Sequence, residues 1–267
     1  MSEGYFDDQS MIRRVHREHI IALSGPRALL MQAAQPVAFA GFFMSSGALE
    51  DPYARLSRTA SVLHAITFGD RSGADRATAR VRAVHRRVRG VLSQPVGRFP
   101  AGTPWAADDA ELLLWIIATL VDSALLVYQR YVGGLTRDER QAYWDDYRVV
   151  GRLFGLRRSD MPATIEDFEA YMDEMLSGDV LHVSPRAREL AIDIVLHPPV
   201  PRQARPLLEL ANFITVGLLP DGLRRQYGLG WDPVRGLALR VGAEYTKRLV
   251  VPVLPRRLRY GTARAAA

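Results

Sequence analysis

The chain has 267 residues, enough for one large domain or two small ones with a substantial apolar core. Its formal net charge of +6 comes from 35 Lys and Arg residues against 29 Asp and Glu residues, and Lys247 is the only lysine. Because cysteine is absent, the composition excludes disulfides, zinc thiolate sites, iron–sulfur clusters, thiolate-ligated haem and covalently attached haem.

Helical periodicity runs through nearly the whole chain, with Gly and Pro at helix-length intervals. The first predicted helices span 8–23, 24–43, 51–69 and 72–92; Ser24 is a candidate N-cap, and Pro36 kinks or divides the second helix. A Pro- and Gly-rich loop is predicted over 95–104. The later helices are predicted over 106–134, 136–155, 164–178, 185–196, 205–219 and 232–250. The pattern predicts one all-α domain over 1–267, a bundle of roughly ten helices.

Two features bear on where the protein works. The N-terminal segment lacks the apolar stretch of a signal peptide, and the longest apolar run, 112–128, is short and interrupted by Asp122. We therefore expect a cytoplasmic protein without stable membrane insertion.

Several kinds of site are not indicated by any motif. The sequence has no dinucleotide-binding glycine motif, P-loop, His-Glu-x-x-His or Gly-x-Ser-x-Gly, and no Glu is followed three residues later by His. His16 and His19 have the spacing of a metal-binding pair, but no third ligand is tied to them. A surface pair is the favoured interpretation.

The segment 79–90, ARVRAVHRRVRG, is the most informative stretch of the sequence. On a helix of about 100° per residue, its three valines, Val81, Val84 and Val88, form a stripe that we expect to be buried. His85 lies at the edge of this stripe, and Arg82 and Arg89 lie one turn to either side of it on the histidine's flank. The remaining arginines, Arg80, Arg86 and Arg87, point elsewhere, toward solvent.

The preceding predicted helix carries a matching polar sector. Arg55, Arg58 and Thr59 share one face, and the short loop after Gly69 predicts that the two helices are antiparallel neighbours. An imidazole, several guanidiniums and a hydroxyl would then surround one site. Such a site suits a haem, because a neutral imidazole can ligate iron and arginines can pair with the propionates.

Two other interpretations of these residues remain open. A lone histidine near an apolar face is more often a hydrogen-bonded core residue than a ligand. Alternatively, the arginines of 79–90 could act together in binding nucleic acid, although the valine stripe argues against that because it requires half of the helix to be buried.

The sequence resembles the latex-clearing protein (rubber oxygenase) family, which includes the oxygenase of the mycophenolic acid pathway. The family pattern Arg-x-x-Lys-Thr is matched by Arg55, Arg58 and Thr59, and Arg-x-x-His-x-x-x-Arg by Arg82, His85 and Arg89. Further similar segments are GPRALLMQAAQP, LSRTASVLHAITFG, ATLVDSALLVYQRY and LLPDGLRRQYGLGW, so the resemblance spans roughly 20–260.

The resemblance implies an all-α fold around a non-covalent haem b, with His85 as the proximal iron ligand. Members of known activity use dioxygen to cleave an isoprenoid C=C bond. By this resemblance, Arg58 and Thr59 are the candidate catalytic residues, and Arg55, Arg82 and Arg89 join them in binding the cofactor. The implied partners are haem, dioxygen and a small apolar substrate, without nucleic acid; the substrate's identity is not indicated.

Three positions depart from the family pattern. Arg58 replaces a lysine that can approach the iron, and arginine stays charged and is a poor metal ligand. Gln35 and Ile117 stand where many relatives have histidine, which leaves His64 as the remaining histidine near Thr59, more consistent with a structural role. These changes keep a second hypothesis open, a haem carrier or sensor without catalytic activity.

Overall fold

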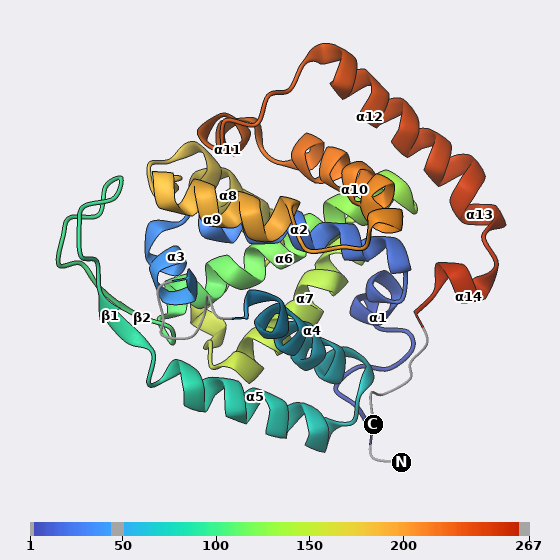
Figure 1. The fold of residues 1–267 in the computed structure, drawn as a ribbon. Coiled ribbons are helices and arrows are strands. Elements are labelled where there is room, and N and C mark those ends of the chain that lie inside the picture. The colour runs from blue at the N-terminus through green and yellow to red at the C-terminus, as the bar shows by residue number, and fades with distance from the viewer. Residues whose placement is uncertain (1–2, 44–50, 262–267) are drawn as a thin grey trace.

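The computed structural model describes residues 3–43 and 51–261, which form a mostly helical protein with one short hairpin (Figure 1). The first helices are α1 (Met11–His16), α2 (Ser24–Ala33), α3 (Pro36–Phe43), α4 (Pro52–Phe68), α5 (Arg71–His85) and α6 (Ala110–Tyr131). The later helices are α7 (Arg137–Phe154), α8 (Ile165–Ser177), α9 (Pro185–Leu196), α10 (Arg205–Leu218), α11 (Asp221–Gln226), α12 (Pro233–Tyr245), α13 (Val251–Val253) and α14 (Arg256–Arg259). The predicted all-α class is confirmed, and short helical turns raise the number of helices above the roughly ten expected. The assignment of 1–267 to one domain stays a prediction.

Helix α6 crosses the middle of the molecule and forms its core (Figure 1). Most of its side chains between Leu113 and Tyr131 are buried, and a strip that includes Ile116, Leu120 and Leu126 is half-buried. A helix that is apolar on every side packs inside a protein or a bilayer. By length and composition alone α6 would suit a membrane span, but most of it is enclosed by this protein, chiefly by α2 and α7.

The prediction of a single helix over 8–23 is wrong. The segment divides into α1 and a 3-10 turn, His19–Leu23, with Glu18 in extended backbone between them. The buried carboxylate of Glu18 accepts hydrogen bonds from Arg259, near the other end of the chain. The break in the helix therefore places a buried charge where a distant segment can pair with it.

The helix predicted over 24–43 is divided at Pro36, as expected, but Ser24 is not its N-cap. The Ser24 hydroxyl donates to the carbonyl of Ile21 at 2.7 Å and so belongs to the preceding turn. At the division, Gln35 caps α3, because its side-chain oxygen accepts a hydrogen bond from the Ala38 backbone N–H at 2.5 Å.

The predicted helix over 72–92 ends early, at His85. The chain then turns into strand β1 (Arg89–Val91), which pairs antiparallel with β2 (Pro104–Ala106). The hairpin extends from the left of Figure 1. β-branched residues alternating with arginine favour this extended ending, which sequence periodicity alone did not separate from helix.

The predicted burial of the valine stripe is also wrong. Val84 is 57% exposed, and Val81 and Val88 are only half-buried. The buried positions of α5 are Ala74 and Thr78, the second of which is at the midpoint of the helix. Helix α5 therefore packs through its N-terminal half, and the end that carries His85 lies at the edge of the fold.

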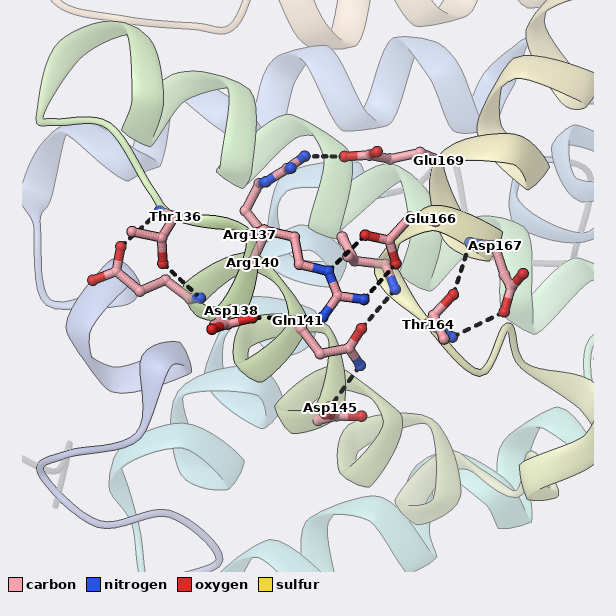
Figure 2. A network of polar contacts seen from close by, with 12 residues as sticks. Thr136, Arg137, Asp138, Arg140, Gln141, Asp145, Thr164, Glu166, Asp167 and Glu169 are labelled. Atoms are coloured by element: carbon pink, nitrogen blue, oxygen red, sulfur yellow. Dashed lines mark hydrogen bonds and ion pairs between the residues drawn. The ribbon is translucent and has the colours of Figure 1, made fainter.

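Helices α7 and α8 begin with the same capping device (Figure 2). The hydroxyl of Thr136 accepts a hydrogen bond from the Glu139 backbone N–H, while the Glu139 carboxylate accepts one from Thr136. Thr164 and Asp167 repeat this arrangement at the start of α8. Reciprocal caps of this kind satisfy backbone donors that the first turn of a helix leaves without partners.

Side chains also tie these two helices together (Figure 2). Arg137 donates to both carboxylate oxygens of Glu166, at 2.7 and 2.9 Å, and Arg140 pairs with Glu169. Gln141 accepts a hydrogen bond from the first backbone N–H of α8 at 2.7 Å. These contacts fix α8 against α7, the helix on which α5 packs.

The chain is anchored by Trp231 before it forms α12. The Trp231 ring lies 5.1 Å from the ring of Phe213 and under the guanidinium of Arg224, 5.2 Å from the ring centroid. A Cβ atom at Gly217 would lie only 2.5 Å from the Trp231 ring, so the close approach requires glycine there. After Trp231, α12, α13 and α14 run along the outside of the fold (Figure 1).

Candidate functional site

His85 is the last residue of α5 and is half-buried. Its Nδ1 atom is buried and has no hydrogen-bond partner among the residues that the structure describes. Burial and the positive charge of Arg55 lower the pKa of His85, and Asp108 partly opposes them. The imidazole is therefore neutral at pH 7, the form that binds a metal.

The arginines of α4 approach this imidazole from the helix that packs beside α5. Helices α4 and α5 pack as antiparallel neighbours, as predicted, so the start of α4 lies near the end of α5 (Figure 1). Burial and the neighbouring charge of Arg58 lower the pKa of Arg55. Arg58 and Thr59 are exposed, and the Thr59 hydroxyl donates to the Arg55 carbonyl at 3.2 Å.

The two arginines that flank His85 in the sequence take different directions in the structure. Arg82 turns toward α7 and donates to the carbonyl of Leu153 at 2.9 Å. Arg89 is on strand β1 rather than on the histidine's helix, and its guanidinium donates to the Arg86 carbonyl at 2.6 Å. The expectation that both flank His85 on one helical face is wrong, because the helix ends before Arg89.

Asp108 is a neighbour of this site that the sequence analysis missed. It lies 3.8 Å from Arg89, and its charge acts on His85. The hairpin β1–β2 brings it there across more than twenty residues of sequence. The signal that could have pointed to it was the Pro- and Gly-rich stretch predicted as a loop over 95–104, most of which forms the turn of that hairpin. Arg55 and Asp108 therefore act directly on the His85 imidazole, while Arg58 lies beside Arg55 and Arg89 beside Asp108.

Gln35 and Ile117, which stand where relatives carry histidine, have structural roles here. Gln35 is 5% exposed and caps α3, and Ile117 is 4% exposed in the core. Their two segments are joined, because Gln32 donates through its side-chain nitrogen to the Thr119 hydroxyl at 2.9 Å. Neither position supplies a titratable group to the site.

The other histidines are placed away from His85 or on the surface. His64 is exposed and packs on Phe68, with the ring centroids 5.0 Å apart. His16 does not form a surface pair with His19; its Nε2 atom is 2.9 Å from the hydroxyls of both Tyr143 and Tyr147. His19 is exposed, and its Nδ1 lies 3.0 Å from the Leu258 carbonyl.

The residues around His85 suit a ligand whose own atoms already coordinate a metal. Among the described residues, no group of three His, Cys, Asp or Glu side chains is arranged to hold a metal ion. A haem needs only one protein nitrogen, since the porphyrin supplies four more, and its propionates need cations. The unpartnered Nδ1 of His85 and the charges of Arg55, Arg58 and Arg89 fit these two requirements.

The mostly helical fold and the neutral imidazole near arginines together indicate a helical protein with a candidate cofactor site. The chain belongs to the family described as ER-bound oxygenase mpaB/B'/Rubber oxygenase, catalytic domain, whose model matches residues 13–248. The family resemblance seen in the sequence is thereby confirmed, and an oxygenase class follows from it. No curated protein and no solved structure matches the chain.

Proposed function

We propose that the protein is a haem b-dependent oxygenase with His85 as the proximal iron ligand, acting with dioxygen on a small apolar or isoprenoid-like substrate. The observation that carries this proposal is the buried, unpartnered Nδ1 of His85 beside Arg55. A buried polar atom without a partner costs about 1–3 kcal/mol, and a bound ligand that engages the ring would offset that cost. Family membership supports the oxygenase class.

The arginines have distinct proposed roles. Burial, and after it the charge of Arg58, lowers the pKa of Arg55, so a propionate bound between the two guanidiniums would relieve their repulsion. Arg89, already paired with exposed Asp108 at 3.8 Å, would hold a second propionate. Arg82 would have to leave the Leu153 carbonyl to join them, so we assign it the role of positioning α5.

The chemistry follows from what these residues keep in place. Bound haem would supply the iron at which dioxygen is activated. His85 would bind that iron through a neutral nitrogen, with its pKa kept low by burial and by Arg55. The Arg58 guanidinium, with five N–H donors and no acceptor, would donate hydrogen bonds to dioxygen or to a propionate, and the Thr59 hydroxyl adjoins it. The cytoplasm is the proposed location.

Oxygen consumption by haem-loaded protein tests the catalytic part of the proposal. A small isoprenoid alkene serves as the probe, and the expected result is alkene-dependent oxygen uptake with carbonyl products found by mass spectrometry. His85→Ala should abolish uptake, while Arg87→Leu, an exposed arginine nearby, should retain it.

A haem carrier or sensor is the second candidate, and the placement of Gln35 and Ile117 favours it. Both side chains are buried in structural roles, so neither offers an imidazole for oxygen chemistry. Protein that binds haem but consumes no oxygen with any alkene would support this candidate. Nucleic-acid binding by the arginines of 79–90 stays a third prediction: Arg82 is turned to the Leu153 carbonyl, but the other arginines of the segment are exposed, and the valine stripe that argued against this interpretation is not buried.

A further inference from the structure

The segment from Asp232 to Gly261, which we call the C-terminal arm, exposes an apolar stripe. Val234, Leu237, Val241 and Tyr245 follow one another at intervals of three and four residues on α12, and are 75%, 55%, 60% and 59% exposed. Leu249 continues the stripe at 57% in the π-helical turn Thr246–Val250. This spacing places all five side chains on one side of the helix.

The stripe lies opposite the face by which the arm packs on the body. Ala243, one of the residues on that inner face, is 4% exposed, and Val251 after the π turn is 3% exposed. Among the described residues, eleven large apolar side chains are exposed, and seven of them are in the arm. The packing of the fold therefore accounts for one apolar face of α12 and leaves the other to solvent.

Positive charge is concentrated in the same segment. The arm contains seven basic and two acidic residues, so it holds a net charge of +5 out of the chain's +6. Its two acidic residues, Asp232 and Glu244, each pair with an arginine within the arm. For Arg240, Arg256 and Arg257 the described part of the chain provides no ion pair. A segment that exposes an apolar stripe and also carries cations without acidic partners complements a surface that is apolar inside and anionic outside.

The arm is fixed to the body at several points, so the stripe is presented on folded structure. Trp231 anchors its beginning, and the Lys247 ammonium donates to the Gln129 carbonyl at 3.1 Å near its middle. At its end, Arg259 donates to both carboxylate oxygens of Glu18, at 2.8 and 2.9 Å. Binding through the stripe would therefore not have to bear the entropy cost of folding the arm.

We propose that the C-terminal arm binds peripherally to an anionic lipid surface, with the apolar stripe of α12 in the interface and the arginines against lipid phosphates. Charge favours this occupant over a second copy of the chain, because pairing two such faces would place +5 against +5. The five apolar side chains of the stripe favour a lipid surface over nucleic acid, because nucleic acid offers no apolar surface to them. The proposal is independent of haem binding at His85.

Co-sedimentation with vesicles tests this surface in the full chain. The protein should bind vesicles of phosphatidylcholine with phosphatidylglycerol, bind pure phosphatidylcholine far less, and lose binding as salt is raised. Each Arg near an anionic surface contributes roughly fivefold in affinity. Arg240→Gln, Arg256→Gln and Arg257→Gln together should therefore weaken binding by on the order of a hundredfold. Arg80→Gln, Arg152→Gln and Arg158→Gln remove the same charge from exposed sites elsewhere and should leave binding nearly unchanged.

A second measurement reports on the stripe directly. Since the natural chain has no cysteine, Val241→Cys gives a single attachment point for an environment-sensitive fluorophore. The label at 241 should shift to the blue with anionic vesicles, whereas a label at Val91→Cys, exposed on the hairpin, should not. Leu237→Glu with Val241→Glu should abolish vesicle binding while leaving circular dichroism and haem content unchanged.

Three results would overturn the proposal. The first is equal binding to neutral and anionic vesicles, or none to either. The second is equal loss of binding in the two arginine triples. The third is another occupant of the stripe. This would be shown by a dimer in light scattering that Leu237→Glu with Val241→Glu converts to a monomer, or by capture of an acidic protein in place of lipid.

Discussion

The guanidinium of Arg82 donates a hydrogen bond to the carbonyl of Leu153, 2.9 Å away, and so ties the helix that ends in His85 to the last turn of α7. The carbonyls in the last turn of a helix have no partners within that helix, and a cation there is favourable. Arg82 thus reaches α7 from one turn before His85. This contact separates the structural role of Arg82 from the cofactor roles assigned to the other arginines.

Replacing the two flanking arginines should therefore give different results. Arg82→Leu should destabilise the haem-free protein by about 1.5–3 kcal/mol, because it removes a charged donor from a backbone carbonyl. Arg89→Leu should leave that stability nearly unchanged and weaken haem binding by about 1.5–3 kcal/mol. Urea unfolding and haem titration measure the two effects. Arg86→Leu and Arg87→Leu are the controls, and equal effects of all four changes would refute the assignment.

Arg58 should not be an iron ligand, because a guanidinium has no lone pair to donate at neutral pH. In haem-loaded protein, carbon monoxide and imidazole should therefore bind rapidly in one step. Arg58→Lys should shift the resting spectrum toward six-coordinate low spin and slow ligand entry, since a desolvated lysine can lose its proton. A low-spin spectrum in the unchanged protein would instead mean that another residue occupies this position, with His64 as the first to test.

Gly90 is required by the hairpin that brings Asp108 near His85. Gly90 pairs with Trp105 across the hairpin, and a Cβ atom at Gly90 would lie 2.7 Å from the Trp105 ring. Gly90→Ala should therefore cost about 1–3 kcal/mol of stability and also weaken haem binding by displacing β1. Gly134→Ala is the control, because a Cβ atom there meets nothing within 4 Å. A stability of Gly90→Ala equal to that of the control would show that the hairpin adapts without strain.

His16 should make the protein less stable below neutral pH. Burial lowers the pKa of His16 to about 4, whereas the unfolded chain gains the proton near pH 6.5. Stability from this group is therefore complete above pH 6.5 and falls as the pH drops toward 4, by about 3 kcal/mol in total. The free energy of unfolding, measured with urea between pH 7 and 5, should fall less with decreasing pH in His16→Gln than in His19→Gln. An equal fall in both variants would contradict this assignment.

Much of the fold was predictable because its helices have clear periodicity and strong end signals. Asp51 and Gly69 bound α4, and Pro36 separates α2 from α3, as local sequence indicates. The end of α5 was not predictable by the same reasoning. Its last turn continues the spacing of an amphipathic helix, but pairing with β2, a long-range contact, determines the structure after His85.

The candidate site was predicted only in part, for a related reason. Positions on one helix fix which residues share a face, so Arg55 and Arg58 were found together. The direction of a long arginine side chain depends on acceptors from other elements, as Arg82 shows with the α7 carbonyl. Asp108 was missed because it reaches the site through the hairpin, and periodicity carries no information on such contacts.

The assignment of His85 as the iron ligand of a bound haem can be tested with the absorption spectrum of freshly purified protein, produced with ample haem. We expect a Soret band from about one haem b per chain, removable by acid and solvent because the chain has no cysteine to tether it. His85→Ala should lose most of this band, and His16→Ala and His19→Ala should keep it. A protein without a Soret band, or equal loss of haem in all three variants, would contradict the assignment of His85 as the iron ligand.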